Sequence, residues 1–205
     1  MTTSYAYALE QLLTDQEHDL VADTIAPVLA WVPGKTTKRA AQPFVFELEH
    51  KLSTAPAKTV AIHLTWDVAK LQARIPGLAA HAERLKSGGS AQREHVPELA
   101  AYGLAFVAIS VLMPGVRVLA FRKGLAPDLL FDVTPGAFKG VEVAGRSTGG
   151  AASLRGVRDG TPQTAGKPAT LGKAAQLVAR ADVAEAHISL WCASPRVAIQ
   201  QKVKP

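Results

Sequence analysis

The sequence predicts an α/β protein with a mixed central sheet flanked by helices. Runs with the two-residue hydrophobic period of strands alternate along the chain with runs of helical period. The chain has 205 residues, of which 48% are hydrophobic and 20% charged, so it can bury a full core without disulfides. Because helical runs stand between the strand-like runs, we expect the helices to pack on the faces of one sheet.

The first ninety residues are predicted to form an N-terminal α+β extension of unknown role. A helix is expected over Tyr5–Trp31, with Pro27 expected to break or kink it. After a basic loop at Lys35–Arg39, strands are expected over 44–49 and 59–66, and short helices after Asp67 and over 76–86. Ser87-Gly88-Gly89-Ser90 is typical of a linker, so the predicted domains are residues 1–90 and 91–205.

The second segment predicts the order helix, three strands, helix, strand. The first helix is expected over His95–Leu112 and to be buried, because it is apolar nearly all round. The three strands are expected over 116–122, 129–133 and 139–145, followed by a polar, Gly-rich segment over 146–168. A helix over 169–181, a strand over 187–192 and a short strand over 197–199 complete the prediction.

The net charge of +6 lies in the second half of the chain. Residues 1–113 hold 10 Lys+Arg and 11 Asp+Glu, a net −1, and residues 114–205 hold 13 and 6, a net +7. A basic half favours an anionic partner, nucleic acid first, although a basic solvated surface gives the same count.

Several classes of protein are excluded by simple patterns. The apolar stretch at 99–113 is shorter than a membrane span, and no signal peptide is recognisable, so we expect a cytoplasmic protein without a membrane partner. Cys192 is the single cysteine, which excludes intrachain disulfides. The six histidines form no pair at metal-ligand spacing, and no Gly-x-Ser-x-Gly motif of serine hydrolases occurs.

Two carboxylates in neighbouring predicted strands carry the chemical prediction. Asp128 follows Pro127 at the start of one strand, and Glu142 lies within the next, between Val141 and Val143. Two converging carboxylates can hold a hard cation such as Mg²⁺, which activates water and stabilises charge on a phosphodiester. Arg146 shares the strand face of Glu142, about 13 Å further along.

At these residues the chain resembles the PD-(D/E)xK, or restriction-endonuclease-like, superfamily. The resemblance covers about residues 95–200 and implies a nuclease fold that binds Mg²⁺ or Mn²⁺. It implies that Asp128 and Glu142 are the metal ligands, with the Val143 carbonyl as a further ligand. It also matches Glu98 to an acidic residue of the preceding helix, and Lys173 and Gln176 to polar residues of the following helix.

The chain departs from the family at the motif lysine. Ala144 stands two residues after the glutamate, where the family places the lysine that positions or activates water. Lys173 or Arg146 could take its place, and Lys173 is the better substitute because an arginine is always protonated. The predicted catalytic set is therefore Asp128, Glu142, Lys173 and Arg146, and Arg146, Arg155, Arg158, Lys167 and Lys173 are predicted to contact nucleic acid.

Other interpretations of the same residues stay open at this point. Asp128 after a proline can be a turn residue, Asp132 is typical of a strand end, and Glu142 can pair with Arg117 or Arg122 on a neighbouring strand. The sequence therefore supports two functions. One is a divergent metal-dependent nuclease acting on DNA, and the other is a catalytically inactive nuclease-fold module, such as an immunity-type or partner protein, that binds through residues 1–90.

Overall fold

The structure is a computed structural model that describes residues 3–34, 41–53, 55–88, 95–122, 124–163, 165–166 and 168–205. The predicted basic loop at Lys35–Arg39 lies outside the described residues, as do Gly89 and Ser90 of the predicted linker. In the described part of the chain, no helix is long and apolar enough to cross a membrane.

A single mixed sheet of eight strands forms the centre of the molecule, in the order β1-β3-β2-β10-β9-β6-β5-β4. The parallel pairs are β1 with β3, β2 with β10 and β6 with β9, and the remaining neighbours are antiparallel. The strands are β1 (Thr3–Ala8), β2 (Phe44–Lys51), β3 (Lys58–Thr65), β4 (Ala120–Phe121), β5 (Leu129–Asp132), β6 (Phe138–Thr148), β9 (Val183–Ser194) and β10 (Arg196–Lys204). Strands from both sides of the predicted linker therefore belong to one sheet, joined where β2 pairs with β10.

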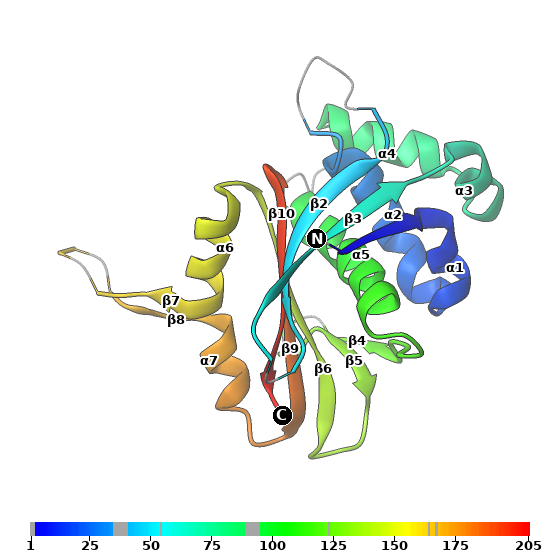
Figure 1. Cartoon of the computed structure of the whole chain (residues 1–205). Coiled ribbons are helices and arrows are strands. Elements are labelled where there is room, and N and C mark those ends of the chain that lie inside the picture. Colours follow the sequence, from blue (N-terminus) through cyan, green and yellow to red (C-terminus); the bar gives the residue numbers. More distant parts are fainter. Residues whose placement is uncertain are drawn as a thin grey trace.

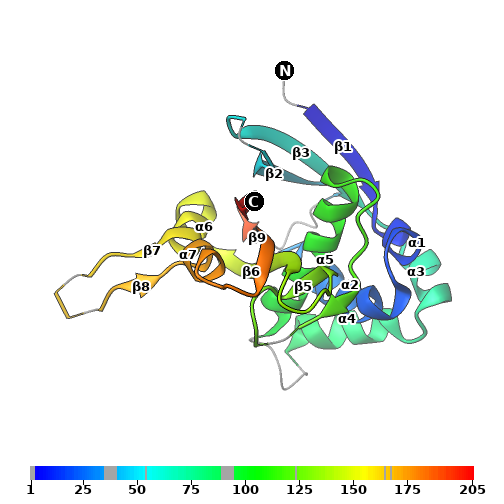
Figure 2. The same cartoon turned by 90° about the horizontal axis from the view of Figure 1, so that it is seen from below.

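Helices cover both faces of this sheet (Figure 1). One face carries α5 (Val96–Leu112) and the helices packed around it, which are α1 (Leu12–Asp15), α2 (His18–Trp31), α3 (Val68–Arg74) and α4 (Leu78–Ser87), with a short 3-10 turn at Leu9–Gln11. The other face carries α6 (Gly150–Asp159) and α7 (Lys173–Val178). Figure 2 shows the small hairpin of β7 (Gly160–Thr161) and β8 (Thr170–Leu171) projecting from the body between these two helices.

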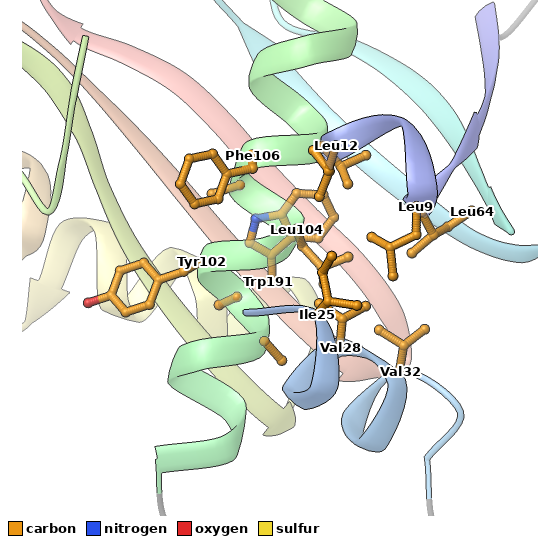
Figure 3. Close-up of a cluster of buried hydrophobic side chains, with 14 of the residues drawn as sticks. Leu9, Leu12, Ile25, Val28, Val32, Leu64, Tyr102, Leu104, Phe106 and Trp191 are labelled. Atoms are coloured by element: carbon orange, nitrogen blue, oxygen red, sulfur yellow. The ribbon is translucent and has the colours of Figure 1, made fainter. Parts of the chain in front are cut away.

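The hydrophobic core follows the same two faces. Between α2, α5 and the sheet lies the larger cluster, in which Phe106, Leu104 and Ile25 surround Trp191 of β9 (Figure 3). Leu154 of α6 and Leu177 of α7 form a second cluster with Ile188 and Leu190 on the opposite face. The prediction of a mixed sheet flanked by helices is confirmed, with α5 buried as expected.

Two predictions for the first ninety residues are wrong. Tyr5–Ala8 form strand β1 rather than the start of a helix, because alternate residues such as Tyr7 face the core while the strand pairs with β3. Pro27 does not end the second helix, since α2 continues to Trp31 and buries Pro27. Packing of α2 against α5 thus outweighs the backbone hydrogen bond that proline cannot donate.

The described residues of the Gly-rich segment predicted over 146–168 include strand residues and a helix that were not predicted. Strand β6 extends to Thr148, and helix α6 follows, because Leu154 is fully buried against the second face of the sheet. The helix expected over 169–181 is only the six residues of α7. The short strand expected at 197–199 is the nine-residue β10, which lies between β2 and β9 in the middle of the sheet.

Candidate functional site

Asp128 lies buried at the start of β5, with its side chain against β6. Its Oδ2 accepts the backbone N–H of Val143 at 2.8 Å, and its exposed fraction is 7%. The β5–β6 ladder reaches only to the pair Leu129–Val141, so Val143 lies beyond its end. The Asp128 carboxylate therefore accepts the backbone N–H that a neighbouring strand would otherwise accept. This is a structural role, which Asp128 can have together with a chemical one.

Glu142 lies in the middle of β6 and faces the α6–α7 side of the sheet. Its strand neighbours Val141 and Val143 both point into the larger core cluster on the other side, so the alternation of the strand places Glu142 opposite them. The side chain is 6% exposed and forms an ion pair with Lys173, the first residue of α7. Its second oxygen, Oε2, is buried without a hydrogen-bond partner among the described residues.

The negative charge of Glu142 lies close enough to affect the protonation of Asp128. Burial, followed by the negative charge of Glu142, raises the pKa of Asp128 to about 7. The Val143 N–H, the Lys173 charge and the Tyr102 hydroxyl oppose this rise and favour the ionised form. Near neutral pH both the protonated and the ionised form of Asp128 are therefore populated. A bound cation would favour the ionised form.

Helix α5 adds a tyrosine that the sequence analysis did not single out. The Tyr102 hydroxyl donates to Oε1 of Glu98 at 3.2 Å, and the ring packs edge-on against Phe121 with centroids 4.5 Å apart. Burial, followed by the charges of Asp128 and Glu98, raises the pKa of Tyr102 above its ordinary value. Tyr102 thus links Glu98 to Asp128. Its spacing of four residues from Glu98 within an apolar helix was the available signal.

The structure separates the predicted basic residues into different environments. Arg155 and Arg158 of α6 pair with Glu49 of β2, at 2.9 Å and 3.9 Å, and Arg158 also pairs with its neighbour Asp159. Arg146 is exposed near the end of β6. Lys167 lies outside the described residues.

The remaining predicted side chains do not join the acidic pair. Gln176 donates to the Leu171 carbonyl at 2.8 Å, beside the start of its own helix. Arg117 pairs with Glu17 at 3.3 Å, and the Arg122 guanidinium lies 4.7 Å from the centre of the Phe138 ring. Neither arginine is the partner of Glu142, which pairs with Lys173 instead.

Asp132 has the strand-end role that its position predicts. Its Oδ1 accepts the backbone N–H of Thr134 at 2.9 Å and the Thr134 hydroxyl at 2.7 Å, which closes a turn after β5. These hydrogen bonds lower the pKa of Asp132. Asp132 therefore stays ionised and is a turn residue.

The chemistry of the Asp128–Glu142 pair fits a hard divalent cation. The unpartnered Oε2 of Glu142 offers a buried anionic oxygen, and a cation beside both carboxylates would offset the negative charge that raises the pKa of Asp128. The described residues contain no cluster of three or more His, Cys, Asp or Glu side chains arranged to hold a metal. Mg²⁺ commonly binds through one or two carboxylates and takes its other ligands from water and substrate phosphate, so two carboxylates are sufficient.

Comparisons of the chain with protein-family models, with curated proteins and with solved structures give no match.

Proposed function

We propose that this protein is a divergent metal-dependent nuclease that hydrolyses phosphodiester bonds in DNA. The observation that carries the proposal is the convergence of Asp128, Glu142 and Lys173 from three separate segments of the chain. An aspartate, an acidic strand residue and a lysine are the three side chains of the PD-(D/E)xK pattern, which this sequence resembles around residues 127–146. The lysine comes from α7 instead of from the position of Ala144.

Each member of this group has a role that follows from its surroundings. Asp128 and Glu142 would hold Mg²⁺ or Mn²⁺, which when bound supplies an activated water and neutralises charge on the phosphate. The Val143 carbonyl remains a predicted further ligand. Glu142 can contribute Oε2 while Oε1 keeps its ion pair, so Lys173 stays beside the reacting phosphate.

Lys173 replaces the missing motif lysine in this proposal. Its side chain is 28% exposed, and its ammonium group pairs with the buried Glu142 carboxylate, so it can serve the solvent side of the site as well. From there it can donate hydrogen bonds to the water or the phosphate oxygens, and its positive charge stabilises the developing negative charge. The Tyr102 hydroxyl, which donates to Glu98, favours the ionised form of Asp128.

A second function is favoured by a specific observation. Both carboxylates already have partners within the chain, since Asp128 accepts the Val143 N–H and Glu142 pairs with Lys173. Such a site can be purely structural, which corresponds to a nuclease-fold module that binds a partner, for example through residues 1–90, without cleaving it.

The deciding experiment measures cleavage of linear and supercoiled DNA, and of RNA, with Mg²⁺ or Mn²⁺ and with EDTA. The variants are Asp128→Asn, Glu142→Gln and Lys173→Ala, and the matched control is Asp132→Asn, which removes a half-buried turn carboxylate on the same strand as Asp128. Metal-dependent cleavage of DNA by the wild type and the control, lost in the first two variants, supports the nuclease. Absence of cleavage together with no metal-dependent shift of the melting temperature contradicts it and leaves the binding module.

A further inference from the structure

A hollow of about 450 Å³ lies on the same face of the sheet as Glu142. It is bounded by β6, by one side of α6 and by the base of the β7–β8 hairpin. Its lining residues are Arg146, Ser153, Gly156, Val157, Gly160, Thr161, Thr170 and Leu171. Leu171 precedes Lys173 by two residues, so the hollow adjoins the Lys173–Glu142 pair along the chain.

The chemistry of this hollow is that of an anion site. Among the described residues, the guanidinium of Arg146 is the only charged group that lines it. The Ser153 hydroxyl is a further donor, and the hydroxyls of Thr161 and Thr170, which hydrogen-bond each other at 2.7 Å, leave one proton to donate. Arg155 and Arg158 are neutralised by carboxylates, whereas Arg146 forms no ion pair with any described residue. A guanidinium that lacks an acidic partner and lies among hydroxyls favours a phosphate ligand.

Gly156 supplies a second, independent observation. It lies inside α6, where glycine is less favourable than alanine. A Cβ added to Gly156 would meet no atom within 4 Å, so neither packing nor a left-handed backbone requires glycine there. The feature that Gly156 does serve is the hollow, which any larger side chain would begin to fill.

We infer that this hollow is a second phosphate subsite, which receives a backbone phosphate of the nucleic acid away from the one that is cleaved. The inference rests on the proposed function for the identity of the ligand. Glu142, Ala144 and Arg146 share one face of β6, and the strand rise places Arg146 about 13 Å from Glu142 along it. A single nucleic-acid strand that lies along this face would place one phosphate at the acidic pair and another at Arg146.

The test measures binding of a fluorescent 20-nucleotide DNA by anisotropy, in EDTA so that no cleavage occurs, over a series of salt concentrations. We expect Arg146→Ala to weaken binding about ten-fold and to reduce the slope of log K against log salt by about 1. Lys70→Ala is the matched control, because Lys70 is exposed on α3, across the sheet from the hollow, and the substitution removes the same charge.

A second variant separates filling of the hollow from loss of charge. Gly156→Leu should fill the hollow and weaken DNA binding, while its melting temperature should match or exceed that of the wild type because leucine is a better helix former. Gly156→Ala should weaken binding by less than Gly156→Leu, because one methyl group only begins to fill the hollow. If both Arg146→Ala and Gly156→Leu bind like the Lys70→Ala control, or if the wild type binds no DNA, the subsite is wrong.

The outcomes distinguish this inference from the proposed function. Binding that depends on Arg146 without any metal-dependent cleavage keeps the subsite and overturns the nuclease. Cleavage with binding that is independent of Arg146 keeps the nuclease and overturns the subsite. Inorganic phosphate tests the ligand itself. A melting temperature that phosphate raises only when Arg146 is present, relative to chloride at equal ionic strength, together with DNA binding that is independent of Arg146, would assign the hollow to free phosphate and overturn the backbone subsite.

Discussion

Lys173 and Glu142 form an ion pair on one face of the sheet although 31 residues separate them in the chain. Glu142 is buried in the middle of β6, and Lys173 approaches it from the first turn of α7. A buried carboxylate is unfavourable without a cationic partner, so this pair explains how the strand tolerates Glu142 between two valines. It also places beside the acid the lysine that the proposed function uses in place of Ala144.

Replacing Lys173 by methionine should destabilise the protein. The substitution keeps most of the side-chain length but leaves the Glu142 carboxylate buried without its cation, which costs about 1–3 kcal/mol when discounted for the partial exposure of Lys173. Urea unfolding at pH 7.5 measures the change in the free energy of unfolding. The double variant with Glu142→Gln should recover part of the loss, and equal losses in the single and double variants would contradict a role for the pair.

Stability should depend on pH through Asp128. Its pKa is raised from the ordinary value of 3.8 to about 7 in the folded protein, so between these values the folded state holds a proton that the unfolded state has released. The contribution of Asp128 is therefore fully present below about pH 4 and is lost as the pH rises through 7, by about 1 kcal/mol per pH unit in the middle of the range. Urea unfolding of the wild type and of Asp128→Asn between pH 4.5 and 8 isolates this contribution as their difference, and a difference that does not fall with pH contradicts it.

Mg²⁺ should stabilise the protein more as the pH rises, because Asp128 then becomes ionised. A cation binds the ionised carboxylate, so the rise in melting temperature produced by Mg²⁺ should be larger at pH 8 than at pH 5.5. The melting temperature is measured in calcium-free buffers with and without Mg²⁺. Asp128→Asn is the control, in which Mg²⁺ should raise the melting temperature only slightly at both pH values. A rise that is the same at both pH values in the wild type would place the metal elsewhere.

Tyr102→Phe should affect the charge of Asp128 more than the packing of the core. The ring can keep its edge-on contact with Phe121, while the hydroxyl that bonds Glu98 and favours ionised Asp128 is removed. The expected results are a loss of about 1 kcal/mol and an upward shift of the pH midpoint of the Asp128 contribution. Leu104→Ala is the control, because it leaves a cavity beside the same helix. It should lower the free energy of unfolding without moving the pH midpoint of the Asp128 contribution.

Gly145→Ala should destabilise the contact between β6 and α5. A Cβ at this position would lie 2.1 Å from the Pro97 carbonyl oxygen and 2.7 Å from its carbon, so backbone would have to move. The expected loss is about 1–3 kcal/mol in urea unfolding. Gly156→Ala is the matched control, since its Cβ meets no atom within 4 Å, and it should be neutral or stabilising. Equal effects of the two substitutions would contradict the close approach.

Much of the fold follows from local patterns. The alternating apolar residues of β2 and β3 and the all-round apolar α5 predict these elements, because each signal lies within the element itself. The termini of the chain were harder to predict. Strand β1 is a short segment beside a strong helical pattern, and β10 carries polar residues such as Gln200 at positions that only neighbouring strands bury.

The candidate site likewise contains residues that local patterns identify and residues whose roles depend on the packing of distant elements. Asp128 and Glu142 can be recognised in the sequence because a carboxylate beside or within an apolar strand is unfavourable unless a partner or a ligand compensates its charge. Lys173 could be named only as one of two substitutes for the motif lysine, and Tyr102 was not singled out, because their roles depend on how α7 and α5 pack on opposite faces of the sheet.

Most of the alternation of helices and strands, the two acids and the concentration of positive charge after residue 113 can be recognised in the chain alone. The cations that lie near those acids are known from the folded arrangement alone. Lys173 meets Glu142, while Arg155 and Arg158 pair with Glu49 and Arg146 lies beside a hollow. The physical reason is that hydrophobic periodicity is a local property, whereas the partner of a buried charge is chosen by strands and helices that meet from distant parts of the chain.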